Sequence, residues 1–134
     1  MASDLQPELW VADTARAISF YERAFGAVVE HRVGAVDAAD GVAQLSVGGG
    51  RFWLAGASDR MGRFDPASIG GGTARFLLVT DEPEPVVAAV VAAGGTCTSP
   101  VAEEHGWLIG RVVDPFGHEW EIGHPVGVWP PPRL

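Results

Sequence analysis

The sequence predicts an α+β fold in which one βαβββ module occurs twice along a chain of 134 residues. Three short matches support a duplication, and each pair lies 68 residues apart. They are Val11-Ala12-Asp13 with Val79-Thr80-Asp81, Gly26 with Gly94, and Phe52-Trp53-Leu54 with Trp120-Glu121-Ile122. Single Gly residues and Val-x-Asp are common, but all three matches fall where a strand or helix is expected to begin or end. An internal repeat is therefore the better explanation.

The first module is predicted at about residues 5–56. A strand over 5–11 leads into a helix over 14–25, which Asp13 or Thr14 can cap and which Gly26 ends. The helix has apolar residues at helical spacing, as expected of one buried face. Three strands follow, around 27–33, 42–47 and 51–55, and the three glycines at 48–50 form a hairpin turn between the last two.

Residues 57–72 are rich in Gly, Ser, Asp and Pro and are predicted to be a loop that links the modules. The second module is predicted at about 73–124, with strands over 74–79, 96–98, 107–113 and 119–122. Its helix opens at Asp81-Glu82-Pro83, with Pro in the first turn and acidic residues at the positive end of the dipole. Each sheet must bury one face under its helix. Two such sheets side by side form a curved, cleft-like half barrel.

Composition limits the classes of function. The length suits a single domain, 1–134, and the net charge of −8 argues against nucleic acid as a partner. No apolar run reaches about 18 residues, so we expect neither a membrane span nor a signal peptide. The single Cys97 excludes an intramolecular disulfide. We therefore expect a reducing, cytoplasmic location.

Several segments resemble the vicinal-oxygen-chelate superfamily, which includes glyoxalase I, bleomycin-resistance proteins and extradiol dioxygenases. They are the strand and helix from Leu9 to Ala27, the turn at 45–50, and Asp114-Pro115-Phe116-Gly117-His118-Glu119-Trp120-Glu121. The resemblance covers roughly residues 5–124 and implies the glyoxalase/bleomycin-resistance fold. It also implies a homodimer, in which the partner could border the cleft.

In the metal-dependent members of that superfamily, the first and last strands of each module supply the metal ligands. Carried over at an offset of 68, the four positions are Gln6, Trp53, Ala74 and Glu121. Gln6 and Glu121 offer oxygen, whereas Ala74 offers nothing and Trp53 only an indole N–H. The resemblance therefore implies no metal cofactor, with a divalent metal kept as the less favoured alternative.

Because side chains alternate between the two faces of a strand, the sequence predicts which residues face the cleft. Glu121 is the candidate general base, or else a remnant of an ancestral metal site. Gln6 and Glu8 are candidate polar contacts, and Arg51 could pair with a ligand carboxylate or with a nearby Glu. The candidate aromatic box consists of Trp10, Trp53, Phe76 and Trp107.

These residues favour a metal-free protein of the bleomycin-resistance type that holds an aromatic or amphipathic compound, for instance to sequester an antibiotic. The acidic charge favours a cationic or neutral ligand. Two alternatives stay open. One is a glyoxalase-like lyase or isomerase with Glu121 as general base, with or without a metal. The other is a dimeric domain whose own side chains fill the cleft.

Overall fold

The computed structural model describes residues 2–35, 37–130 and 132–133. Both end residues of the predicted domain, 1 and 134, lie outside the described residues. The elements are β1 (Glu8–Val11), α1 (Thr14–Phe25), β2 (Val28–Val33), β3 (Val42–Val47), β4 (Gly50–Gly56), η1 (Asp59–Met61), α2 (Pro66–Ile69), β5 (Arg75–Val79), α3 (Pro83–Ala92), β6 (Thr96–Glu104), β7 (Trp107–Val113) and β8 (Glu119–Pro125). No helix in these ranges is long and apolar enough to cross a membrane.

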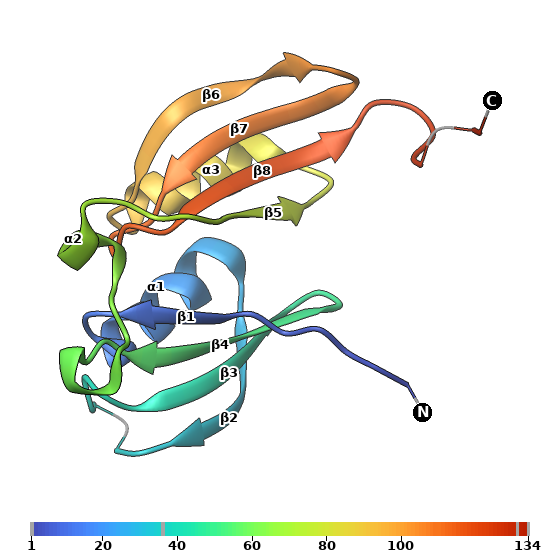
Figure 1. Cartoon of the computed structure of the whole chain (residues 1–134). Helices are drawn as coiled ribbons and strands as arrows, with labels where there is room; N and C mark the ends of the chain where they lie inside the picture. The colour runs from blue at the N-terminus through green and yellow to red at the C-terminus, as the bar shows by residue number, and fades with distance from the viewer. Residues whose placement is uncertain (1, 36, 131, 134) are drawn as a thin grey trace.

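The predicted α+β fold with two βαβββ modules is confirmed. In module 1 the strand order is β1-β4-β3-β2, and in module 2 it is β5-β8-β7-β6. In each module the first strand pairs in parallel with the last, and the other pairs are antiparallel. Figure 1 shows the two sheets side by side, with β1 and β5 at the boundary between them and α1 and α3 packed together behind. The other face of each sheet, turned away from the helices, is called its open face below.

Helix α1 has the bounds that the sequence predicts. The Asp13 carboxylate accepts a hydrogen bond from the Arg16 backbone N–H at 3.1 Å, and Gly26 ends the helix with a φ of 66°. One side of the helix is buried and the other carries polar residues, so the helix seals the core. The largest fully buried side chains are those of Tyr21, Phe20, Leu9, Leu45, Leu54 and Ile122.

Several elements differ from the predicted ones, and β8, for example, ends at Pro125 instead of Ile122. β1 begins at Glu8, because Leu5 is 96% exposed and has no strand beside it. β6 continues through Pro100 to Glu104, which is tolerated because β6 is an edge strand. The predicted linker is not a plain loop, since it contains η1 and α2.

The register of the second module corrects the offset of 68 for its first strand. Glu8 lies opposite Trp53 in module 1, whereas Leu77 lies opposite Glu121 in module 2. If Trp53 and Glu121 are equivalent, the equivalent of Gln6 is therefore Arg75 and not Ala74. The helices show the same shift, because α1 begins at Thr14 and α3 begins 69 residues later, at Pro83.

Candidate functional site

The turn between β7 and β8 is organised by one buried carboxylate, that of Asp114, which is 4% exposed. Its Oδ1 accepts hydrogen bonds from the backbone N–H groups of Phe116 at 2.9 Å and His118 at 3.0 Å. Its Oδ2 accepts one from Trp120 Nε1 at 3.0 Å and one from the Tyr21 hydroxyl. An Asp-Pro-x-Gly turn is favourable locally, and these four donors fix its conformation.

This turn joins the two modules at β1. His118 donates its Nε2 hydrogen to the backbone carbonyl oxygen of Trp10, with the two atoms 2.7 Å apart. Gly117 has a φ of 91°, and a Cβ placed there would lie 2.8 Å from Pro66 Cβ in α2. The linker therefore packs tightly on the turn, and the turn holds β1.

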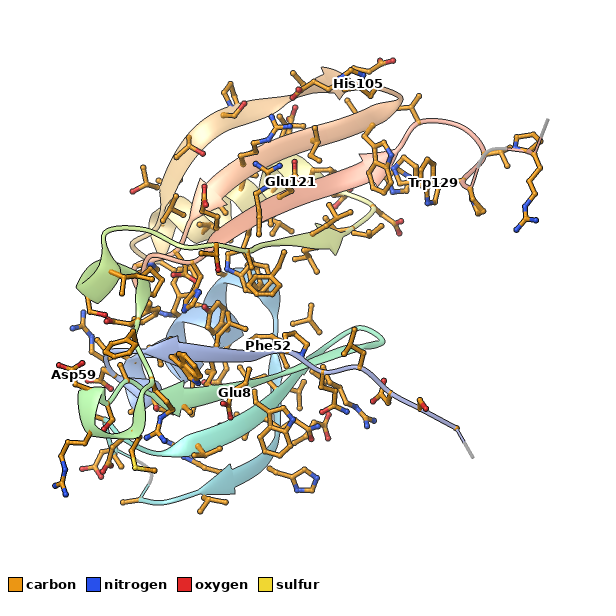
Figure 2. All side chains as sticks on the ribbon, viewed as in Figure 1. Glu8, Phe52, Asp59, His105, Glu121 and Trp129 are labelled. Carbon is orange, nitrogen blue, oxygen red and sulfur yellow. The ribbon has the colours of Figure 1, made fainter. Side chains whose placement is uncertain are left out.

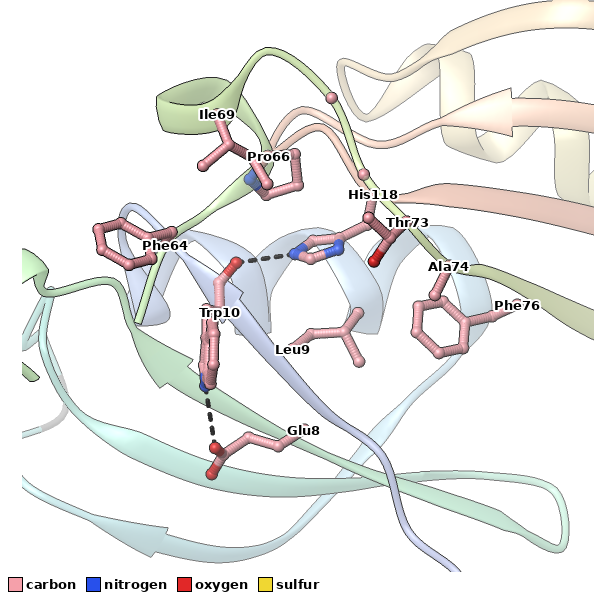
Figure 3. A pocket seen from close by; sticks show the side chains of 12 residues that line it. Glu8, Leu9, Trp10, Phe64, Pro66, Ile69, Thr73, Ala74, Phe76 and His118 are labelled. Carbon is pink, nitrogen blue, oxygen red and sulfur yellow. Dashed lines mark hydrogen bonds between the residues drawn. The ribbon is translucent and has the colours of Figure 1, made fainter. Parts of the chain in front are cut away.

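A cavity of about 300 Å³ lies between β1, the linker and the start of β5, and it is called the Trp10 cavity here. Its walls are mostly apolar, with Glu8, Thr73 and His118 as polar members (Figure 3). The Glu8 carboxylate accepts a hydrogen bond from Trp10 Nε1 at 2.9 Å. The remaining walls are formed by Leu9, Trp10, Phe64, Pro66, Ile69, Gly71, Gly72, Ala74 and Phe76.

On the open face of module 1, the side chains of Gln6 and Trp53 are hydrogen-bonded to each other. Gln6 Oε1 accepts from Trp53 Nε1 at 2.8 Å and from Gln44 Nε2 at 2.7 Å. The Trp53 indole also stacks on His31, with ring centroids 6.5 Å apart. Gln6 and Trp53 therefore lie together, and the Trp53 indole N–H is already bonded to Gln6.

On the open face of module 2, Glu121 is bound by two arginines. Its Oε2 lies 3.1 Å from Arg111 Nε and 3.4 Å from Arg75 Nη2. Arg111 also donates to both carboxylate oxygens of Glu104, at 2.9 and 3.5 Å. The hydrogen bond to Glu104 raises the pKa of Arg111, and the same bond lowers the pKa of Glu104. Two guanidinium groups therefore hold the Glu121 carboxylate in place on this face.

The predicted cleft residues thus separate into several groups. Glu8, Trp10 and Phe76 line the Trp10 cavity, whereas Glu121 lies on the other sheet (Figure 2). Trp107 packs against Trp129, with ring centroids 5.1 Å apart.

Two further positions differ from the predicted cleft. Phe76 points to the core side, where its ring lies 5.2 Å from that of Trp120, because the first strand is shifted by one residue relative to the offset of 68. Arg51 is exposed at the start of β4 and lines a second, smaller depression between the modules.

The four positions that correspond to metal ligands do not form a ligand set for a divalent cation. Trp53 presents a hydrogen-bond donor to Gln6, and Arg75 presents a positive charge to Glu121. Both would repel or displace a cation rather than coordinate it. Within the described ranges, no group of three or more His, Cys, Asp or Glu side chains is placed to hold a metal ion.

The sequence pattern did not predict Arg111, His118, Phe64 and Ile69 as residues of the site. Arg111 could have been found, since alternation in the predicted strand 107–113 places it on the face of Trp107. His118 and the linker could not, because their positions depend on contacts between modules that no local pattern encodes.

Comparisons with known proteins agree with this geometry. Residues 7–123 match the model of the glyoxalase-like domain. An uncharacterized protein of Mycobacterium bovis is 34% identical over 126 residues, covering 91% of this chain and 83% of its own length. A gene product of Arabidopsis thaliana superposes with a TM-score of 0.70 at 27% identity, covering 91% of this chain and 98% of its own. TioX from Micromonospora sp. ML1 superposes with a TM-score of 0.70 at 23% identity, covering 94% and 98%, and shows the fold alone.

Proposed function

The chain belongs to the glyoxalase-like domain family within the vicinal-oxygen-chelate superfamily, and from that premise we propose that it binds a small aromatic or amphipathic molecule in the Trp10 cavity. The observation that carries the proposal is the composition of that cavity, with mostly apolar walls and few polar groups. Its volume of about 300 Å³ lies at the lower end of the range typical of small-molecule pockets.

The aromatic side chains favour a flat ligand. Trp10 and Phe64 both line the cavity, and Phe64 is 46% exposed (Figure 3). Ile69 on α2 is 58% exposed beside them. A ring bound against these groups would remove apolar surface from water.

The charge of the lining favours a cationic or hydrogen-bond-donating substituent. Glu8 is the acidic residue of the lining, and one hydrogen bond from Trp10 leaves acceptor sites on its carboxylate. The net charge of −8 adds a long-range attraction for cations. Sequestration of an amphipathic amine, as in antibiotic resistance, would require binding alone and no catalytic step.

Three other properties are part of the proposal. Binding needs no metal, because Arg75 and the Trp53 indole occupy the positions that would supply ligands. The protein acts as a homodimer, in which a partner would border the open faces. It works in a reducing, cytoplasmic setting, consistent with the exposed free thiol of Cys97.

The enzyme alternative, a lyase or isomerase with Glu121 as general base, is less well supported. Arg75 and Arg111 both contact Oε2 of Glu121, whereas a general base needs a carboxylate oxygen within hydrogen-bonding reach of the proton that it removes.

The test is calorimetric titration with matched pairs of aromatic compounds, such as naphthylmethylamine and naphthylmethanol. We expect the amine to bind more tightly than the alcohol, and Glu8→Gln to remove that difference while Trp10→Ala weakens both. Glu103→Gln, an exposed acid on β6, is the matched control. Absence of binding for every compound, or affinities that do not change in the Glu8 and Trp10 variants, would exclude the proposal.

A further inference from the structure

We propose a second binding site, on the helix side of the molecule, for a small oxyanion carried on an aromatic ring. The site is a depression of about 240 Å³ between α1, the end of α3 and the turn before β8. It lies behind the sheets, away from the open faces, and is independent of the Trp10 cavity. Its lining comprises Arg16, Ser19, Phe20, Arg23, Ala93, Gly94, Pro115 and Phe116.

Two arginines supply the positive charge. Arg16 and Arg23 are seven residues apart on α1, so they lie on one face of the helix about 10 Å apart along its axis, within reach of one ligand between them. Both are exposed, and neither forms an ion pair with another described residue. The remaining contact of the Arg23 side chain is a long one, 3.4 Å from Nε to the Ser19 carbonyl oxygen. Their guanidinium groups are therefore available to an oxyanion.

The floor of the depression is aromatic. Phe20 is 2% exposed, and its ring meets that of Phe116 edge to face with centroids 6.2 Å apart. The Ser19 hydroxyl at the rim can donate a hydrogen bond to an oxyanion. A ring lying on this floor would place an attached phosphate or carboxylate between the two guanidinium groups.

The sign of the local charge differs from that of the whole molecule. The net charge is −8, yet the lining contains two arginines and no acidic residue. The carboxyl end of α3 adds only a partial negative charge of about half a unit, which is less than two full positive charges. The site therefore favours an anion even though the remainder of the surface disfavours one.

The test uses phenyl phosphate as the probe and amide chemical shifts as the readout. We expect phenyl phosphate to shift the amide signals of Ser19, Gly94 and Phe116, and inorganic phosphate or phenol alone to bind more weakly. Added sodium chloride should weaken the binding, because the contact is ionic. The double variant Arg16→Gln/Arg23→Gln should bind about tenfold more weakly or worse, since charge-assisted hydrogen bonds are lost.

The matched control is Arg60→Gln/Arg133→Gln, which changes the net charge equally at two exposed positions outside the lining. It should bind like the unchanged chain. The proposal is overturned if phenyl phosphate shifts none of the three amides, if phenol shifts them equally, or if both double variants bind alike. Because all four positions are exposed and Gln is a good helix former, we expect both variants to fold.

Discussion

Tyr21 on α1 donates its hydroxyl hydrogen to Asp114, a carboxylate 93 residues further along the chain. Both residues are buried, and Trp120 Nε1 donates to the same oxygen at 3.0 Å. The contact ties the helix of module 1 to the turn that begins β8 in module 2. Because that turn also presents His118 to β1, the pair indirectly fixes one wall of the Trp10 cavity.

Replacing Tyr21 by Phe should therefore destabilise the fold. The substitution keeps the ring but removes one donor from a buried charge, which costs about 1.5–3 kcal/mol. Urea denaturation measures the loss in the free energy of unfolding. Ser46→Ala is the control, since it removes an exposed hydroxyl bonded to Glu30 and should cost less than 1 kcal/mol. Equal losses in the two variants would contradict the role of the buried pair.

The same pair predicts loss of stability at alkaline pH. Burial, and then the charge of Asp114, raise the pKa of Tyr21 well above its ordinary value of 10.0. The folded state thus holds the phenolic proton more tightly than the unfolded state. Its stabilisation is complete below pH 10 and is lost as pH rises from there through the raised pKa. Tyr21 is the single tyrosine, so tyrosinate absorbance reports it alone. Titration of the folded protein at the ordinary pKa would refute this.

The sequence alone was sufficient to predict the helices and strands that have a regular apolar pattern. It was not sufficient to predict how the residues of the site are arranged. The bounds of α1 and β3 follow from local pattern, because apolar spacing and capping residues lie within each segment. A constant offset of 68 between the modules predicted Ala74 as the equivalent of Gln6, whereas the equivalent residue is Arg75. The offset is not constant along the modules, because α1 has 12 residues and α3 has 10. A shift of one residue reverses the face of a strand, so the error moved Phe76 from the core side to the cleft.

Gly117→Ala should disturb the Trp10 cavity, because the added methyl group would lie 2.8 Å from Pro66 Cβ and push the linker away. Gly106→Ala is a matched control. Its φ of 82° is similar to the 91° of Gly117, but no atom lies within 4 Å of the added Cβ. Both variants should lose about 1–2 kcal/mol from backbone strain. Only Gly117→Ala should also weaken binding of the aromatic amine in calorimetry, and equal affinities in both variants would argue against the linker as a wall.

Glu121→Gln should leave binding in the Trp10 cavity unchanged, because Glu121 belongs to the open face of module 2. The partly exposed ion pairs with Arg75 and Arg111 should contribute no more than about 1 kcal/mol to stability. Calorimetry and urea denaturation on the same variant measure both effects. A tenfold loss of affinity would instead place the ligand beside Glu121, as the enzyme alternative requires.

Intermolecular nuclear Overhauser effects would locate the bound ligand. With the bound aromatic amine, we predict contacts from its ring protons to the side chains of Trp10, Phe64 and Ile69. Contacts to Trp107 and the methylene groups of Arg111, with none to Trp10, would exclude the Trp10 cavity and place the ligand on the open face of module 2.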